Sequence, residues 1–167
     1  MIKQYSHYVD SKLEWIGQVP AQWRQTKLKY ITSISKGRKA NEDFQDFKEG
    51  MIAYLSMEYL RNQTEHPFYV FADDPNVVLV DEEDLLILWD GSKAGEIVKA
   101  KKGALSSTMG KIHLDADYFD LNFLTYYLKN AEKFIQSNTV GMGIPHVSGE
   151  ILRTLFVAFP SVKIQNK

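Results

Sequence analysis

A short, uninterrupted run of apolar residues constrains this chain more than any other feature. Residues 85–89 (Leu-Leu-Ile-Leu-Trp) lie between Asp84 and Gly91. The run has the length of a β-strand, and its lack of alternation with polar residues is typical of a strand that is covered on both faces. We therefore expect residues 85–89 to form a central strand, with other elements packed on each side of its sheet.

Further strands are expected to be short. Apolar and β-branched residues recur in brief segments that are separated by turn-forming sequences such as Asp73-Asp74-Pro75-Asn76. The segments that we expect to be strands are residues 51–57, 66–71, 76–80, 96–99, 104–106, 109–114 and 155–159.

Two helices are predicted near the C-terminal end. Asp120 is a favourable cap residue, and the apolar stripe that follows it at helical spacing indicates an amphipathic helix over about residues 120–136. The stripe consists of Leu124, Tyr127, Leu128, Ala131 and Ile135. Ser148 can cap a shorter helix over about residues 149–154. Strands followed by helices favour an α+β fold, which we expect to be a single compact domain with a mostly antiparallel or mixed, strongly twisted sheet.

The N-terminal segment shows no sustained period. We expect residues 1–22 to form an irregular arm, with Trp15, Ile16 and the adjoining Trp23 docked on the core. Residues 23–35 allow a short strand followed by a helical turn, and periodicity alone does not separate these two structures.

Composition indicates a globular protein with one domain. The chain has 167 residues, of which 44% are hydrophobic and 25% are charged, and this balance is that of ordinary folded domains. No apolar run reaches the ~20 residues that span a bilayer, and the first residues lack the apolar core of a signal peptide. A cytoplasmic protein without membrane contact is therefore expected. The absence of cysteine excludes disulfides, thiolate zinc ligands and cysteine nucleophiles.

The charges are unevenly distributed, although the net charge is only -1. Residues 22–39 contain six cations and no carboxylate, whereas residues 73–84 contain six carboxylates and no cation. Residues 91–111 carry five lysines against Glu96, which gives 5 - 1 = +4. We expect a molecule with separate acidic and basic regions, the alternative being that each run is merely a solvated face.

Three segments together resemble a known family. They are residues 14–23 (Glu-Trp-Ile-Gly-Gln-Val-Pro-Ala-Gln-Trp), residues 89–95 (Trp-Asp-Gly-Ser-Lys-Ala-Gly) and residues 141–148 (Gly-Met-Gly-Ile-Pro-His-Val-Ser). In this order and at this spacing they resemble the target recognition domain of the specificity subunit of type I restriction-modification enzymes. The resemblance covers nearly the whole chain and implies a target recognition domain over residues 23–160. It also implies that residues 161–167 begin a spacer helix that is missing here, in either a truncated chain or a natural half-subunit.

The resemblance implies a protein without catalytic activity. Its expected function is to read one half of a bipartite double-stranded DNA target and to direct other subunits to it. The expected partners are a methyltransferase subunit, which would bind S-adenosylmethionine, and a restriction and translocase subunit. No cofactor is expected in this chain.

Two other classes of function remain as alternatives. A small nuclease or methyltransferase fragment is one, because Asp10 with Lys12, and Asp46 with Lys48, form Asp-x-Lys pairs. The chain lacks both an Asn-Pro-Pro-Tyr-like loop and a glycine-rich cofactor turn after a first strand, and its four histidines have no metal-ligand spacing. We therefore expect no catalytic residues and no metal site. A protein-interaction module without a role on DNA is the other alternative.

The expected DNA contacts are of two kinds. Cations would neutralise phosphates without reading sequence, and these are Arg38, Lys39, Lys101 and Lys102. Residues with suitable donors and acceptors would contact base edges, and these are Ser92, Lys93, Ser106, Ser107 and His146. For His146 the alternative is a loop residue that is hydrogen-bonded to backbone. The glycines beside these residues can form plain tight turns or allow close approach of a ligand, and they are Gly91, Gly95, Gly141 and Gly143.

Overall fold

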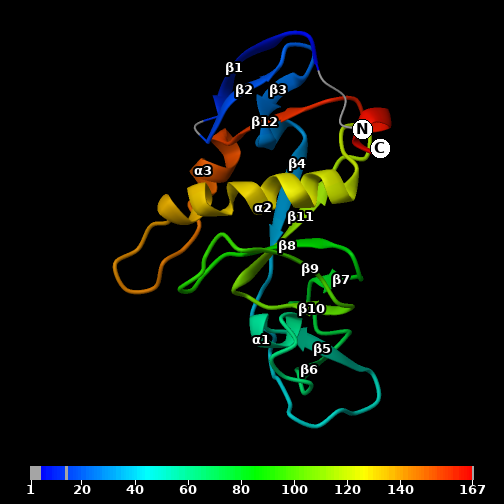
Figure 1. Cartoon of the computed structure of the whole chain (residues 1–167). Coiled ribbons are helices and arrows are strands. Elements are labelled where there is room, and N and C mark those ends of the chain that lie inside the picture. The colour runs from blue at the N-terminus through cyan, green and yellow to red at the C-terminus, as the bar shows by residue number, and fades with distance from the viewer. Residues whose placement is uncertain (1–4, 14, 167) are drawn as a thin grey trace.

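The computed structural model describes residues 5–13 and 15–166 (Figure 1). The strands are β1 (Tyr8–Leu13), β2 (Ile16–Pro20), β3 (Arg24–Lys27), β4 (Thr32–Lys36), β5 (Met51–Leu55), β6 (Phe68–Phe71), β7 (Leu79–Val80), β8 (Leu85–Leu88), β9 (Ile97–Lys99), β10 (Gly103–Leu105), β11 (Met109–Leu114) and β12 (Phe156–Phe159). The helices are a 3-10 turn η1 (Leu28–Tyr30), α1 (Met57–Leu60), α2 (Leu121–Ser137), α3 (Gly149–Thr154) and α4 (Val162–Gln165).

The apolar run forms β8, an inner strand of the sheet β4-β11-β8-β9. All of β8 is buried, and its side chains alternate between two separate cores. Leu85 and Ile87 belong to the core that includes α2, whereas Leu86 and Leu88 belong to a second core on the other face of the sheet. The prediction of a central strand covered on both faces is confirmed.

Helix α2 packs against this sheet with the predicted stripe. The five stripe residues are all buried, and the Asp120 carboxylate accepts the backbone N–H groups of Asn122 and Phe123 at 3.0 and 3.1 Å. Ser148 caps α3 by accepting the Ile151 N–H at 3.4 Å. Both predicted helices and their caps are therefore confirmed.

The remaining strands form three further sheets. Sheet β6-β5-β10-β7 contains the parallel pair β5 and β10, and β1-β2 and β12-β3 are two-stranded antiparallel sheets. The α+β class and its mostly antiparallel, mixed pairing are confirmed. The strands are nevertheless divided among four sheets, and the second core lies between the two four-stranded sheets.

The N-terminal segment is not irregular. Strands β1 and β2 form an antiparallel hairpin whose register shifts between Asp10 and Leu13. Most of its side chains are exposed, so the hairpin carries little of the alternation that reveals a strand in sequence. Leu13 and Val19 lie in the first core, and Trp15 and Ile16 pack against it, as expected. Residues 1–4 and Glu14 of the expected arm lie outside the described residues.

Several other segments differ in detail from their predictions. The strand expected over residues 76–80 is limited to β7. The helical turn in residues 23–35 is limited to η1, and Ile34 lies in β4. Residue 57 begins α1 instead of ending a strand, because Ser56 accepts the Tyr59 N–H and caps a helical turn. At the C-terminal end α4 forms a single turn, and Lys167 lies outside the described residues. No helix of the described chain has the length and apolarity required to cross a bilayer.

Candidate nucleic-acid interface

Four segments that are far apart in the sequence meet at the end of β8. They are residues 36–39 at the end of β4, residues 89–95 after β8, residues 106–108 between β10 and β11, and residues 140–148 between α2 and α3. Figure 1 shows the loops after β8 (green) and after α2 (orange) projecting on the same side of the fold. We call this region the loop junction.

Backbone hydrogen bonds join the segments of the loop junction. The Gly91 N–H donates to the Pro145 carbonyl at 2.9 Å, and the Val147 N–H donates to the Trp89 carbonyl at 2.8 Å. The Trp89 N–H donates in turn to the Thr108 carbonyl at 2.7 Å. Because each bond joins two loops, the side chains that these loops carry are held in a fixed relative position.

Residues 36–39 join the junction through close packing. A Cβ atom at Gly37 would lie only 2.1 Å from the carbonyl oxygen of Ser106, so only glycine fits there. The Tyr54 hydroxyl extends the connection, since it donates to the Arg38 carbonyl at 3.3 Å and accepts the Ser107 N–H at 3.2 Å. The backbone that carries Arg38 thus lies directly beside the turn after β10.

One ion pair lies within the junction. The Lys36 ammonium is 3.0 Å from the Asp90 carboxylate, and it lies 5.5 Å from the centre of the Trp89 ring. Trp89 packs against the first core and holds the base of the loop, as expected for a core residue. The pair offsets the negative charge of Asp90, the carboxylate of loop 89–95, at the surface where phosphates would approach.

The structure brings most of the predicted DNA-contacting residues to this junction. Four of their side chains are exposed, and these belong to Arg38, Lys39, Ser92 and Lys93. Ser107 and His146 are half-buried, and the main chain of His146 forms a two-hydrogen-bond bridge with Val140. Ser106 is buried, and its hydroxyl lies 3.1 Å from that of Thr108. Ser106 therefore faces the protein interior, unlike the four exposed residues.

Lys101 and Lys102 lie elsewhere. They connect β9 to β10, at the end of β8 opposite to the junction, because Lys99 pairs with Leu85 at the start of that strand. The Lys101 ammonium donates to the Tyr59 carbonyl at 2.9 Å and to the Asn62 side chain at 2.7 Å. It also lies 4.1 Å from the centre of the Tyr59 ring. Lys101 therefore anchors α1, while Lys102 is exposed.

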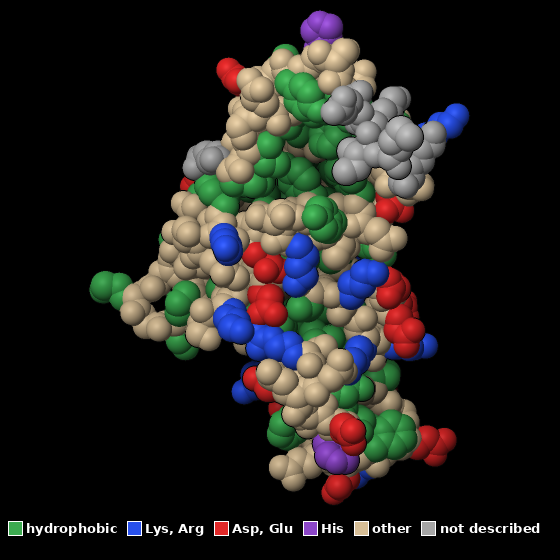
Figure 2. All heavy atoms as spheres, viewed as in Figure 1, with side chains coloured by type: hydrophobic (Ala, Val, Ile, Leu, Met, Phe, Trp, Pro, Cys, Tyr) green, Lys and Arg blue, Asp and Glu red, His purple; other side chains and the backbone are tan. Residues whose placement is uncertain are grey.

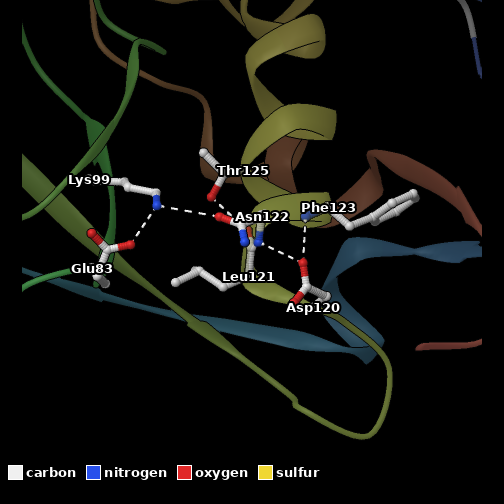
Figure 3. Close-up of polar contacts among 7 residues, drawn as sticks. All are labelled: Glu83, Lys99, Asp120, Leu121, Asn122, Phe123 and Thr125. Carbon is white, nitrogen blue, oxygen red and sulfur yellow. Dashed lines mark hydrogen bonds and ion pairs between the residues drawn. The ribbon is translucent and has the colours of Figure 1, made fainter. Parts of the chain in front are cut away.

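The expected separation of acidic and basic regions is wrong for two of the charged runs. Antiparallel pairing of β8 with β9 and β11 places the carboxylates before β8 beside lysines of the basic run, and ion pairs of 2.5 Å join Glu83 to Lys99 and Asp84 to Lys111. Lys99 also reaches the Asn122 side chain at 3.4 Å, beside the cap of α2 (Figure 3). Figure 2 shows the same mixture of blue and red side chains across the middle of the molecule.

Three residues that hold the loop junction together were not singled out from the sequence. Lys36 holds Asp90, Tyr54 joins two segments through its hydroxyl, and the Thr108 carbonyl accepts the Trp89 N–H. The sequence offers one signal for these residues, which is Lys36-Gly37 at the end of a strand-like pattern. The hydrogen bonds of Tyr54 depend on pairing between segments far apart in the chain, and no local pattern indicates them.

The nuclease alternative gains no support from geometry. The described residues contain no group of three or more side chains able to bind a metal ion. Asp10 lies in β1, where its carboxylate accepts the Gln18 amide at 3.2 Å, and Asp46 is exposed in the long loop between β4 and β5.

Comparisons with known proteins agree with the resemblance seen in the sequence. Residues 20–167 match the family model described as the type I restriction modification DNA specificity domain. The chain is 37% identical over 150 residues to the type I restriction enzyme MjaVIII specificity subunit of Methanocaldococcus jannaschii, and the match covers 90% of this chain and 35% of that protein.

Solved structures of low sequence identity share the fold. The HsdS subunit from Thermoanaerobacter tengcongensis superposes with a TM-score of 0.66 at 17% identity, over 89% of this chain and 36% of that one. The S subunit of a type I restriction-modification system from M. genitalium gives a TM-score of 0.57 at 17% identity, over 82% and 34%. The chain spans about a third of the length of these relatives. It belongs to the type I restriction modification DNA specificity domain family.

Proposed function

We propose that this chain is a DNA target recognition module that reads one half of a bipartite duplex target and has no catalytic activity of its own. It presents the DNA to a methyltransferase subunit, which binds S-adenosylmethionine, and through that complex to a restriction and translocase subunit. Such an assembly works on cytoplasmic DNA. Membership of the specificity domain family, together with the length of chain relative to its relatives, supports a role as one module of a larger specificity subunit.

The loop junction is the observation that carries this proposal. It presents exposed cations on one segment, Arg38 and Lys39, beside the hydroxyl and ammonium groups of Ser92 and Lys93 on another. Cations supply affinity for phosphates, and hydrogen-bonding side chains on rigid loops supply base readout. The hydrogen bonds between the loops fix the spacing of these two kinds of group.

The two other predicted cations would contact DNA less directly. We propose that Lys102 reaches a phosphate on a flanking part of the duplex, and that Lys101 acts mainly by holding the adjacent turn in place. The hydrogen bonds of Lys101 to α1 support this division. Ser106 supports the junction through Thr108, and Ser107 lies closer to the surface.

A binding-site selection tests the proposal. The chain, assembled with the methyltransferase subunit of its own system, is offered a library of random DNA duplexes. We expect a defined half-site to be enriched, and we expect Lys93→Ala or His146→Ala to change the preferred base at one position, with a loss of about 1–3 kcal/mol for each base contact removed. Lys163→Ala, on the exposed face of α4, is the matched control.

Three results would contradict this function. One is enrichment of the same half-site when residues 23–160 are exchanged for another recognition domain. Another is saturable binding of S-adenosylmethionine by the chain alone, which would support the alternative that the chain is a methyltransferase fragment. Cleavage of DNA that is lost in Asp10→Asn or Asp46→Asn would likewise favour a nuclease.

A further inference from the structure

The loop between α2 and α3 carries two apolar side chains that are largely exposed to solvent. We call residues 140–146 the tip loop. Met142 is fully exposed at 108% of its reference area, and Ile144 is 70% exposed. Figures 1 and 2 show this loop as the outermost projection on its side, with hydrophobic side chains at its end. Single exposed apolar residues are common on surfaces, but two at the tip of one projecting loop indicate a contact with another molecule.

The tip loop is held firmly at its base. Val140 and His146 exchange two backbone hydrogen bonds of 2.9 and 2.8 Å. Gly141 has a φ of +105°, and a Cβ there would lie 2.7 Å from the Ile144 carbonyl oxygen, so both conformation and space require glycine. Because the base is fixed, the apolar tip is presented in one position and binding orders little additional chain.

The glycine at position 143 is not required by the conformation or packing of the protein itself. Its φ is not positive, and a Cβ added to it would meet no atom within 4 Å. Nothing inside the protein therefore requires glycine at this position. A missing side chain next to Met142 does make the tip narrow, which suits insertion between closely spaced groups of a ligand.

The charge around the tip loop indicates a polyanion as the ligand. Between Lys133 and Gly149 the chain has no Asp or Glu. The neighbouring loop contributes the exposed Lys93, and the carboxylate of Asp90 is paired with Lys36. An apolar tip beside Lys93, with the neighbouring Asp90 carboxylate paired to Lys36, matches DNA, whose phosphates attract cations and whose base steps expose apolar faces when they are separated.

We propose that the tip loop is an apolar wedge that inserts Met142 at a base step of the target DNA, with Ile144 packed against the same step. This inference rests on the proposed function and adds a second mode of recognition to it. Aliphatic wedges of this kind separate neighbouring bases and select for steps that unstack easily. Met142 and Ile144 would then contribute to specificity without forming any hydrogen bond.

The test uses the double variant Met142→Ser/Ile144→Ser in the assembled complex. Leu79→Ser is the matched control, since Leu79 is an aliphatic residue that is 58% exposed on β7 and away from the tip loop. Affinity is measured for the duplex that the wild-type complex selects. 2-Aminopurine, whose fluorescence rises on unstacking, is placed at each position of that duplex in turn.

We expect the double variant to bind about tenfold or more weakly, as two aliphatic side chains lose their burial. The slope of log affinity against log salt should not change, because no phosphate contact is removed. Wild-type and Leu79→Ser complexes should raise 2-aminopurine fluorescence at one step, and the double variant should not.

Other outcomes overturn the inference in distinguishable ways. If the wild-type complex selects a half-site and the double variant binds it equally well, the wedge is wrong while the proposed function stands. If the double variant fails to assemble with the methyltransferase subunit, the tip loop contacts that protein instead of DNA. If the wild-type complex selects no sequence, the proposed function fails and the wedge fails with it.

Discussion

Positions 36 and 37 of the loop junction require side chains of opposite size. Lys36 needs a long cationic side chain to reach Asp90 at 3.0 Å. Gly37 needs no side chain at all, since the backbone of Ser106 occupies the place of a Cβ. Together the two residues fix how the segment that carries Arg38 leaves β4. A change at either position would therefore move a predicted phosphate contact.

We predict that Gly37→Ala destabilises the protein strongly. The new methyl group would meet backbone, which cannot rotate away, so overpacking should cost about 1–3 kcal/mol or more. The free energy of unfolding is measured by urea denaturation. Gly143→Ala is the control, because its Cβ meets no atom within 4 Å and it should change stability by less than about 0.5 kcal/mol. Equal stabilities of the two variants would contradict the packing described for Gly37.

Helix α2 is the element on which the first core depends. Its five buried residues face the sheet, and its N-terminal end contacts two other parts of the chain. The Asp120 N–H donates to Gln165 of α4 at 2.9 Å, while Asn122 meets Lys99 at 3.4 Å (Figure 3). Near the middle of the helix the Tyr127 hydroxyl lies 3.3 Å from both the Phe156 carbonyl and the Ala158 N–H of β12.

The cap of α2 gives a prediction at this scale. Asp120→Ala leaves the backbone N–H groups of Asn122 and Phe123 without their acceptor and should lower the free energy of unfolding by about 0.5–2 kcal/mol. Asp120→Ser retains a capping oxygen and should recover most of this loss. Urea denaturation of the three proteins measures the effect. An alanine variant as stable as the wild type would show that the Asp120 cap does not contribute to the stability of the protein.

Tyr127 gives a second prediction, on pH. Burial raises the pKa of Tyr127 above its usual value, and the hydrogen bond from the Ala158 N–H opposes this only partly. Above about pH 10 the unfolded chain loses the tyrosine proton while the folded chain keeps it. The unfolded state then binds fewer protons, so the free energy of unfolding falls as pH rises.

Tyr127→Phe isolates this contribution. At about pH 8 it should cost about 1 kcal/mol, because the hydroxyl contacts to β12 are lost. The difference between wild type and variant should shrink as pH rises through about 10 and above. Unfolding by urea at several pH values measures the difference, in which contributions of the other tyrosines cancel. A difference that is constant with pH would contradict a buried, protonated Tyr127.

At the scale of the whole molecule, charge is arranged by the folding of distant segments. Two of the five lysines in residues 91–111 are paired with carboxylates that precede β8. Lys101 is bound to α1. Exposed cations at the loop junction, in contrast, come mainly from the short segment that contains Arg38 and Lys39. A protein with a net charge of -1 can thus present a local cationic surface.

We predict that this local surface sets the salt dependence of DNA binding. Arg38→Ala/Lys39→Ala should weaken binding to all sequences and reduce the slope of log affinity against log salt by about 2, near 0.9 for each phosphate contact. Lys12→Ala/Lys163→Ala is the matched control, since it removes two exposed cations from β1 and α4. The slopes are measured by titration at several salt concentrations. A larger change in slope for the control variant would show that Arg38 and Lys39 are not the main phosphate contacts.

Much of the fold follows from local features of the chain. The uninterrupted apolar run predicted β8, and cap residues with an apolar stripe predicted α2 and α3, because both signals depend on neighbouring residues alone. Three short segments were also sufficient to indicate the family, which the comparison over residues 20–167 confirms. The β1-β2 hairpin was missed because its strands expose most of their side chains and show no alternation.

Sequence by itself therefore determined the central strand β8, the helices α2 and α3, the α+β class and the family of this protein. Only the tertiary structure decided how the four loops meet, which lysines are neutralised and that Ser106 is buried while Lys93 is exposed. The physical reason is that these properties depend on pairing between residues far apart in the chain. Lys111 lies beside Asp84 only because β11 pairs with β8. These two strands are separated in the chain by β9 and β10, so no hairpin turn fixes their pairing locally.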